Sequence, residues 1–419
     1  MTTFQSAVSE DAWRRVREAG HAGVLVGIPC FNNATTIGHV VESAAQGLSR
    51  HFPGMKGVIV ASDGGSSDGT LRVVEDAPVP DGIGKITLAY QGLPGKGSAF
   101  RAIFEVARAL GVKGCVVVDS DLRSITPDWI RLLATPVVDG SFGYVAPYYV
   151  RHKYDGTITN SIAYPMTRSL YGEAVRQPIG GDFGFSAGLL DHYLGQDVWD
   201  TDVARFGIDI WMTTTAINEG FPVCQAQLGA KIHDAKDPAA SLGPMFRQVV
   251  GTLFGLMARY ESRWKAMEGS RRVPLVGDPV VEEPEPVPVT VPAMIDKFRA
   301  AHRSEAGFWG TFLSSENMEE LETIAALGAE EFRFPVDLWV RIVYDFAVAY
   351  HREDLEPARV VDALTGLYYG RTAAFCRETA SMSTNQVESE TIEAVAQHFE
   401  LLKPYLMKRW EEVIGRRTP

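Results

Sequence analysis

Asp119 and Asp121 stand directly after a run of valines, Val116–Val118, in an Asp-x-Asp triplet. Side chains alternate between the two faces of a strand, so both carboxylates point the same way at the strand's end. Two hard oxygen ligands in that arrangement suit Mg²⁺ or Mn²⁺ shared with a substrate diphosphate. Because such a triplet taken alone is more often a solvated turn, its interpretation depends on the loops around it.

The elements that must position these carboxylates alternate along the first 150 residues. Short apolar strands separated by single helices predict a parallel sheet with right-handed crossovers, and ligands bind such sheets at the carboxyl ends of the strands. A polar or glycine-rich loop follows each strand, so these loops should meet along one edge. We expect strands at residues 23–29, 57–62, 85–90 and 114–118, and helices at 35–48, from 69 to 75 and at 97–110.

Two of these loops carry residues suited to a nucleotide. Asp63 follows the second strand directly, where a carboxylate can accept hydrogen bonds from a base or a ribose. Asp63 and Asp68 could instead form Asx turns, an interpretation we favour for Asp68 as the cap of the next helix. Lys96, between two glycines at a helix N-terminus, is well placed for phosphate oxygens. The chain has no Walker A loop and no G-x-G-x-x-G after the first strand, which argues against a dinucleotide cofactor.

Two later segments suggest acceptor recognition. Residues 151–160, RHKYDGTITN, are dense in hydrogen-bond donors, and Arg151 could hold a small carboxylate in a bidentate fork. The same composition also fits an exposed polar loop. Gly180 and Gly181 permit a close approach of the backbone to a ligand. Asp182, flanked by apolar residues, is expected to be partly buried and to need partners.

Two further residues could complete the site. Asp209 lies in an apolar run and could hold sugar hydroxyls or cap the helix expected at 211–218. His233 lies beyond an apolar strand. A lone histidine is usually structural, but the aspartate pair makes this one a candidate third metal ligand.

The composition is that of an ordinary globular protein, with 419 residues, 46% hydrophobic and 22% charged, enough for two domains with cores. A net charge of −12 argues against a nucleic-acid surface. The four cysteines lie far apart without a C-x-x-C pair, which fits a reducing compartment. The polar N-terminus does not resemble a signal peptide and no apolar run reaches the length of a membrane span, so we expect a cytoplasmic protein without a membrane or nucleic-acid partner.

Composition also divides the chain. Residues 268–292 are rich in proline and glutamate without periodicity, which predicts an extended connector. After them, apolar residues recur at helical spacing, and we expect a helical region that serves as a dimerisation or lid element. The predicted division is therefore a catalytic domain at residues 1–267, the connector at 268–292 and the helical region at 293–419.

Taken together, the loops resemble those of nucleotide-sugar glycosyltransferases of the GT-A fold, over residues 23–250. The resemblance rests on several motifs in the order of that family: VGIPCFNN, SDGGSSDGT, PGKG, DSD, QPIGGDF, FGID and His233. Within the fold, the chain is similar to mannosylglycerate synthases and glucosyl-3-phosphoglycerate synthases, and most of all to bacterial glucosylglycerate synthases. The fold class that this implies is α/β, a Rossmann-like and mostly parallel sheet with a helical C-terminal region.

The resemblance also implies a role for each matching residue. Donor binding would fall to Pro29, Asn32, Asp63, Gly64, Lys96, Asp119, Ser120 and Asp209. The acceptor would be held by Arg151, Thr157, Thr159, Asn160, Gly180 and Gly181. A divalent metal, Mg²⁺ or Mn²⁺, would be bound by Asp119, Asp121 and His233. The catalytic residues would be Asp209, Asp182 and Lys96.

The function implied is a retaining, metal-dependent transfer of glucose from a nucleoside-diphosphate glucose to D-glycerate by a homodimer, giving the compatible solute glucosylglycerate. Acceptance of 3-phosphoglycerate stays an alternative, because His152 and Lys153 could meet a phosphate, and so does transfer of mannose. A nucleotidyltransferase would need a glycine-rich basic loop after the first strand, where this chain has Pro29-Cys30-Phe31-Asn32. A non-catalytic nucleotide-sugar binding protein is disfavoured by the combined aspartate pair, lysine and histidine.

Overall fold

The computed structural model describes residues 6–233, 243–279 and 284–415. The chain divides into two compact units, each made of segments that are separate in the sequence. The sheet unit comprises Met1–Val150, Val175–Ala235 and Val273–Glu285. The helical unit comprises Arg151–Ala174, Lys236–Arg272 and Pro286–Pro419.

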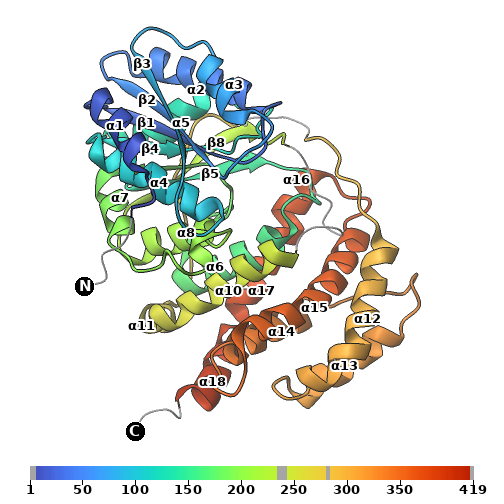
Figure 1. Ribbon diagram of the computed structural model, residues 1–419. Helices are drawn as coiled ribbons and strands as arrows, with labels where there is room; N and C mark the ends of the chain where they lie inside the picture. Colours follow the sequence, from blue (N-terminus) through green and yellow to red (C-terminus); the bar gives the residue numbers. More distant parts are fainter. Residues whose placement is uncertain (1–5, 234–242, 280–283, 416–419) are drawn as a thin grey trace. The chain divides into compact units, whose positions relative to one another are not determined.

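The sheet unit is built around one mixed sheet (Figure 1). Its strands in the described residues are β1 (Val24–Cys30), β2 (Gly57–Asp63), β3 (Ile83–Ala89), β4 (Gly114–Val117), β5 (Tyr144–Val150), β7 (Phe183–Ser186), β8 (Val223–Ala230) and β10 (Leu275–Val276). They lie in the order β10-β8-β5-β7-β4-β1-β2-β3. All neighbouring pairs are parallel except those of β7, which is antiparallel to both β4 and β5. The carboxyl ends of β1 to β5 therefore lie at one edge of the sheet.

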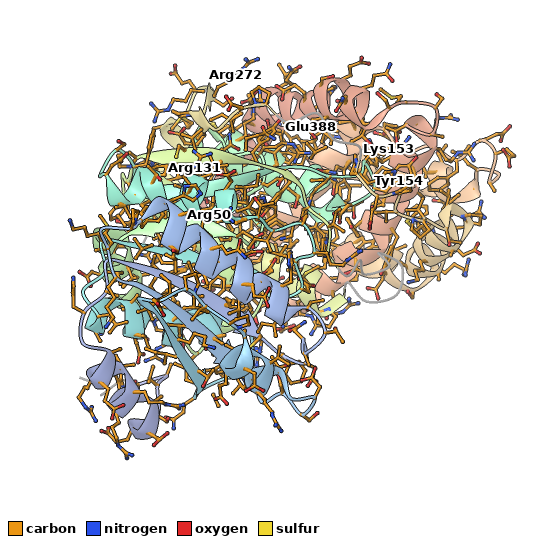
Figure 2. The ribbon with its side chains drawn as sticks, turned by 90° about the horizontal axis from the view of Figure 1, so that it is seen from above. Arg50, Arg131, Lys153, Tyr154, Arg272 and Glu388 are labelled. Atoms are coloured by element: carbon orange, nitrogen blue, oxygen red, sulfur yellow. The ribbon has the colours of Figure 1, made fainter. Side chains whose placement is uncertain are left out.

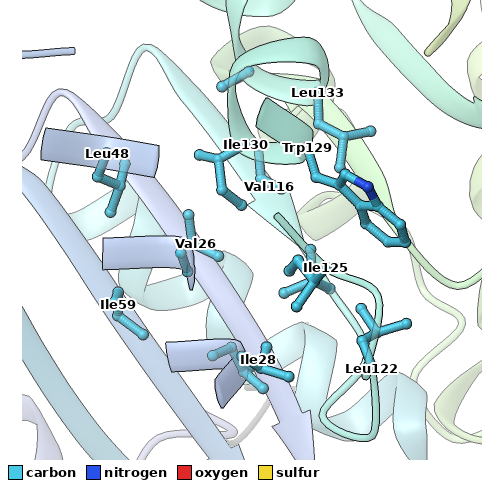
Figure 3. Packing of buried hydrophobic residues seen from close by; sticks show 14 of the residues in the cluster. Val26, Ile28, Leu48, Ile59, Val116, Leu122, Ile125, Trp129, Ile130 and Leu133 are labelled. Carbon is cyan, nitrogen blue, oxygen red and sulfur yellow. The ribbon is translucent and has the colours of Figure 1, made fainter. Parts of the chain in front are cut away.

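Helices cover both faces of this sheet. They are α1 (Glu10–Ala19), α2 (Ile37–His51), α3 (Thr70–Asp76), α4 (Lys96–Ala109), α5 (Pro127–Val138), α7 (Ala187–Leu194) and α8 (Ile208–Asn218). On β1, Val26 and Ile28 belong to a buried apolar cluster with side chains of α2 and α5, among them Ile130 (Figure 3). Gly27 faces α4 instead, since a Cβ there would lie 2.4 Å from Ile103. Alternation along β1 thus places α2 and α5 on one face and α4 on the other.

The helical unit carries the C-terminal helices and two earlier segments of the chain (Figure 1). Its helices in the described residues are α6 (Tyr164–Tyr171), α10 (Gly243–Arg259), α11 (Glu261–Ala266), α12 (Val291–Trp309), α13 (Ser315–Ala326), α14 (Val336–Ala349), α15 (Pro357–Glu378), α16 (Thr384–Gln386), α17 (Glu393–Leu401) and α18 (Lys403–Val413). A π-helical turn, Thr159–Ala163, runs directly into α6, and β6 (Glu173–Ala174) pairs with β9 (Arg271–Arg272).

The expected fold class, a mostly parallel α/β sheet of the GT-A type with a helical C-terminal region, is confirmed. The four strands expected in the first 150 residues correspond to β1, β2, β3 and β4. The domain boundaries predicted at residues 267 and 292 stay a prediction. The two compact units are groups of residues in contact, and they do not test where a functional domain begins or ends. No helix in the described ranges combines the length and the apolar character needed to span a bilayer.

The structure corrects the helix-cap alternative for Asp209 and adds detail to two other segments. The motif QPIGGDF ends in a strand, β7, because Phe183 and Phe185 alternate with Gly184 and pair between β4 and β5. Asp209 does not cap a helix from outside, because it is the second residue of α8, whose N-cap is Gly207. The connector contains the two short strands β9 and β10, and β10 extends the sheet beside β8.

Candidate active site

The loops after β1 and β2 are joined by short polar side chains. The backbone N–H of Asn32 donates to Ser66 Oγ (2.8 Å), and Asn32 Oδ1 accepts from the N–H of Ser67 (2.9 Å). Asn32 has a positive φ of 55°, a conformation that asparagine tolerates better than most residues. Ser120 donates to Asn33 Oδ1 (2.8 Å), which ties the loop after β1 to the segment after β4. Two of the predicted donor residues, Asn32 and Ser120, therefore belong to one hydrogen-bonded edge.

The backbone at the ends of β1 and β2 also runs close together. Pro29 is buried in β1, and the N–H of Gly64 donates to the carbonyl of Cys30 (2.8 Å). A Cβ on Gly64 would lie 3.3 Å from the ring of Phe31, which is largely exposed. An exposed ring beside bare backbone leaves an apolar surface at the end of β1, where the sequence places the base.

Asp63 and Asp68 both form Asx turns. The buried carboxylate of Asp63 accepts hydrogen bonds from the N–H groups of Gly65 (2.9 Å) and Ser66 (2.8 Å). Asp68 accepts from the N–H of Thr70 (3.0 Å), and its hydrogen bond from the Thr70 hydroxyl lowers the pKa of Asp68. The Asx turn of Asp68 is therefore seen, but Asp68 is not the cap predicted for the next helix, because the N-cap of α3 is Gly69. Asp63 shares its oxygens with a turn as well.

Lys96 lies between two carboxylates. Its Nζ is 2.9 Å from Oδ1 of Asp119 and 3.3 Å from Oδ2 of Asp209. Burial alone lowers the pKa of Lys96, but the carboxylates of Asp119 and Asp209 outweigh burial and raise this pKa. A positive charge is thus fixed at the first residue of α4, where the N–H groups of the helix also favour an anion.

The glycine after Lys96 allows this arrangement. A Cβ on Gly97 would lie 1.8 Å from the carbonyl oxygen of Val203, so another residue would force the backbones apart. The N–H of Gly97 donates to the carbonyl of Arg205 (3.1 Å). This contact holds the start of α4 against the segment that leads into α8, and Lys96 and Asp209 meet as a result.

Lys231, which the sequence motifs do not single out, is the second cation of the site. Its Nζ lies 2.8 Å from Oδ2 of Asp119, 2.8 Å from Oδ2 of Asp182 and 2.8 Å from the carbonyl oxygen of Gly180. Burial alone raises the pKa of Asp119, but Lys231 and Lys96 outweigh burial and lower it. Both carboxylate oxygens of Asp119 are therefore paired with lysines.

Asp182 lies behind Asp119 and is enclosed. Its side chain is 0% exposed, and its Oδ1 accepts the backbone N–H of Asp119 (2.7 Å). Its Oδ2 accepts from the Tyr149 hydroxyl and from Lys231. This carboxylate, expected to be catalytic, thus contacts the groups that support Asp119 and has no surface for a substrate.

Gly180 and Gly181 leave no room for side chains. A Cβ on Gly180 would lie 2.2 Å from the ring of Pro147. Gly181 has a φ of +96°, and a Cβ there would lie 2.2 Å from Oδ2 of Asp119. Both glycines are expected near the acceptor from the sequence. Because neither has a Cβ, the backbone of this segment can pack against Pro147 and Asp119.

Asp121 differs from Asp119, Asp182 and Asp209, each of which contacts a lysine. Within the described part of the chain, no side chain forms a hydrogen bond or an ion pair with Asp121. Burial and then the charge of Asp119 raise the pKa of Asp121, whereas the charges of Lys231 and then His233 act in the opposite direction.

The residues described do not by themselves complete a metal site. No group of three or more histidine, cysteine, aspartate or glutamate side chains among them stands in such an arrangement. Asp119 is held by two lysines, so Asp121 and the neighbouring His233 are the ligands that this structure offers. A carboxylate and an imidazole fit Mg²⁺ or Mn²⁺ if phosphate oxygens of a ligand supply further positions.

Asp209 has one oxygen without a partner. Its Oδ2 pairs with Lys96, whereas its Oδ1 is buried and has no hydrogen bond within the described residues. Burial raises the pKa of Asp209. An unsatisfied buried acceptor costs about 1–3 kcal/mol, so a ligand hydroxyl that donates to this oxygen would bind favourably.

The other residues predicted to hold the acceptor belong to the helical unit: Arg151, Thr157, Thr159 and Asn160. The last two begin the π-helical turn, a feature that is frequent at functional sites. The Oγ1 of Thr157 is hydrogen-bonded to the hydroxyl of Tyr368 in α15. Nε of Arg151 lies 3.4 Å from Oδ2 of Asp155.

Lys153 serves inside the helical unit as a cap for the end of α15. Its Nζ donates to the carbonyls of Thr379, Ala380 and Met382, at 2.7, 3.2 and 2.7 Å. The ring of Tyr154, labelled with Lys153 in Figure 2, lies 5.1 Å from the same nitrogen. An ammonium group has three donors, so Lys153 has none left for a phosphate.

Solved structures similar to this chain include complexes of glucosyl-3-phosphoglycerate synthase from Mycobacterium tuberculosis. The complex with Mg²⁺ and UDP is 21% identical, with a TM-score of 0.43, over 60% of this chain and 84% of that chain. The complex with Mn²⁺, UDP-glucose and phosphoglyceric acid is 21% identical, with a TM-score of 0.42, over 61% and 85%. The complex with Mn²⁺, UDP and glucosyl-3-phosphoglycerate is 21% identical, with a TM-score of 0.44, over 66% and 95%. Among curated proteins, none matches the chain significantly.

A family model matches the part of the chain that carries the charged edge. The model for Glycosyl transferase family 2 covers residues 25–194, which include β1 to β4 and the loops with Asp63, Lys96, Asp119 and Asp121. The matched stretch thus contains both the parallel strands and most of the charged groups at their carboxyl ends. Residues 25–194 of this chain accordingly match the family described as Glycosyl transferase family 2.

Proposed function

We propose that this protein transfers glucose from a nucleoside-diphosphate glucose to D-glycerate with retention of configuration, giving glucosylglycerate. The observation that carries the proposal is the set of charges at the carboxyl edge of a family 2 domain. Lys96 stands at a helix N-terminus between two carboxylates, and Asp121, two residues after Asp119, forms no ion pair within the described residues. The choice of glucose and of glycerate is supported by the resemblance of the sequence motifs.

Asp121 would hold a divalent cation. We propose Asp121 and His233 as its ligands from the protein, with Asp119 kept on the two lysines. When bound, the cation supplies a positive charge that neutralises the leaving diphosphate. The lack of a counter-ion at Asp121 supports this assignment, because a half-buried carboxylate is most stable beside a cation.

The chain's own residues act at the two ends of the bond that breaks. Lys96, kept charged by its carboxylate partners, donates to the diphosphate as negative charge develops there. Asp209 accepts a sugar hydroxyl at the oxygen that has no other partner and so orients the sugar.

The geometry favours attack without a covalent intermediate. In the described sheet unit, Asp182 is enclosed and Asp209 is paired with Lys96, so neither stands ready as a nucleophile. The hydroxyl of glycerate then attacks from the face that the diphosphate leaves. It gives its proton to the departing phosphate oxygen, and the α-linked donor yields an α-linked product.

The proposed acceptor segment is residues 151–160, which begin the helical unit directly after β5 in the sequence. Arg151 follows Val150 directly and can hold the carboxylate of glycerate in its planar fork. Free glycerate is favoured over 3-phosphoglycerate because all three donors of Lys153 are used by backbone carbonyls.

Product analysis tests the proposal. The purified protein is incubated with Mg²⁺ or Mn²⁺, with the UDP, GDP and ADP derivatives of glucose and with GDP-mannose, against D-glycerate and against 3-phosphoglycerate. We expect a glucosylglycerate whose NMR coupling constant shows the α-anomer. Faster reaction with 3-phosphoglycerate would reassign the acceptor, and release of pyrophosphate would indicate a nucleotidyltransferase instead.

An Arg151→Ala variant is expected to raise the KM for glycerate about 10- to 100-fold, because one or two charged hydrogen bonds to the acceptor carboxylate are lost. The KM for the donor should stay within about twofold, since the donor does not use these bonds. Steady-state kinetics with each substrate varied in turn gives both values. The matched control is Arg50→Ala in α2, where Arg50 contacts the exposed Gln46. Equal changes in both KM values for Arg151→Ala would remove this residue from the acceptor site.

A Gly181→Ala variant is expected to lower kcat about 100-fold, since displacing a positioned group by about 1 Å has an effect of that size. The added Cβ would collide with Oδ2 of Asp119, and the positive φ strains any other residue. The control is Gly188→Ala in α7, where an added Cβ meets nothing within 4 Å. Thermal melts show whether both variants are folded. A kcat close to that of the control would mean that Asp119 need not be held at this position.

A further inference from the structure

We infer that Lys231 is a positioning residue, which holds Asp119 and, through Asp119, holds Lys96 where the diphosphate of the donor binds. The nature of that ligand rests on the proposed function, whereas the dependence of Lys96 on Lys231 can be measured without it.

The inference starts from an alternating series of charges. In order, the members of the series are Asp182, Lys231, Asp119, Lys96 and Asp209. Successive partners are separated by 2.8, 2.8, 2.9 and 3.3 Å. Each side chain is thus held by charges of the opposite sign on its neighbours, and such pairs are strong where water is excluded.

The first two members of this series are enclosed, whereas Asp119 and Lys96 are partly exposed. The side chains of Asp182 and Lys231 are 0% and 3% exposed, whereas those of Asp119 and Lys96 are 24% and 15% exposed. The first two residues therefore cannot reach a ligand, and the latter two can. Lys231 also has its three N–H donors directed at Asp119, Asp182 and the carbonyl of Gly180. Of the groups to which Lys231 donates a hydrogen bond, Asp119 is the one whose side chain is exposed enough to pass an effect on to a ligand.

Asp182 and Tyr149 anchor the enclosed end of the series. Asp182 accepts the backbone N–H of Asp119 through Oδ1 (2.7 Å) and the Lys231 ammonium through Oδ2 (2.8 Å). The Tyr149 hydroxyl donates to Oδ2 of Asp182, and its ring lies 5.0 Å from Nζ of Lys231. Asp119 is thus fixed by its backbone and by one carboxylate oxygen, and its other oxygen is left to orient Lys96.

A double-mutant cycle between Lys231 and Lys96 tests this dependence. Lys231→Met keeps the length of the side chain and removes its charge, and we expect kcat to fall about 100-fold with a change in the KM for glycerate below about threefold. In a Lys96→Ala background, the same substitution should lower kcat by less than about threefold, because the group that Lys231 positions is already absent. Equal factors in the two backgrounds would overturn the inference.

Binding gives a second reading that does not need turnover. Calorimetry with UDP, GDP and ADP measures Kd for the same variants. We expect Lys231→Met to raise Kd in the wild-type background and to change it much less in the Lys96→Ala background. If the wild-type protein transferred no sugar but bound a diphosphate in this non-additive way, the proposed function would fail and the role of Lys231 would stand. Additive losses in Kd would reject that role.

Two further variants separate positioning from folding. Tyr149→Phe removes only the hydroxyl that supports Asp182. We expect it to lower kcat about tenfold, compared with about 100-fold for Lys231→Met, and to have no such effect in the Lys96→Ala background. Lys403→Met removes another buried lysine, which donates to the carbonyl of Met267 in the helical unit, and should leave kcat within about twofold. If Lys403→Met lowered kcat as much as Lys231→Met, the loss would follow from removing any buried lysine and the inference would be wrong.

Discussion

An Asp121→Ala variant is expected to lose about 10³-fold or more in kcat and to stop responding to added Mg²⁺ or Mn²⁺. Asp121 forms no ion pair within the described structure, so its substitution removes a ligand without breaking an ion pair. Activity is measured against metal concentration after treatment with EDTA. The matched control is Asp128→Ala in α5, whose exposed carboxylate contacts Arg131. Full activity of Asp121→Ala, with inhibition by EDTA unchanged, would contradict the metal assignment.

The same carboxylate should make metal binding depend on pH. Burial and then Asp119 raise the pKa of Asp121 above its ordinary value. A raised pKa means that the carboxyl keeps its proton up to a higher pH, and the protonated form does not bind a cation. Affinity for Mn²⁺, measured by calorimetry across pH, should therefore fall on acidification earlier than an unperturbed aspartate would cause. The Asp121→Ala variant, which lacks this ligand, should bind Mn²⁺ too weakly to give such a titration.

Lys96→Ala is expected to lower kcat by about 10²- to 10³-fold, the usual effect of removing a group that stabilises charge in the transition state. It also leaves the buried Oδ2 of Asp209 without its cation. Steady-state kinetics with a saturating donor gives the effect on kcat, and calorimetry with the nucleoside diphosphate gives the effect on the ground state. Lys113→Ala, an exposed lysine before β4, is the control. A change in kcat below about threefold would place the diphosphate elsewhere.

The sequence predicts the part of the site that comes from strand ends. Asp63, Lys96 and Asp119 each follow an apolar run that is a strand or begin a helix that follows one, so local patterns suffice to place them at the carboxyl edge. The DxD, lysine and glycine motifs are short in sequence and lie in one parallel sheet. Because these strands are parallel, their loops lie at the same edge of the sheet, although β4 pairs with β1 and not with β3.

The sequence does not reveal how Asp119 is held. Lys231 is 112 residues away from Asp119 in the sequence, and only the pairing of the strands brings the two together. In the sequence, Lys231 is marked only as a charged residue at the end of the apolar run Leu228–Ala230, two residues before His233. Such a charge can as easily face water, and deciding otherwise requires knowing that β7 enters antiparallel between β4 and β5.

The path of the chain has a consequence for making parts of the protein. The polypeptide passes from one compact unit to the other after Val150, Ala174, Ala235, Arg272 and Glu285. A fragment that stops at residue 267 would carry two stretches, 151–174 and 236–267, deprived of the C-terminal helices they belong with. Such a truncation would expose the apolar side chains of these stretches to water and promote aggregation. The chain therefore has no single position at which it could be divided to express a catalytic fragment or to exchange the C-terminal region between homologues.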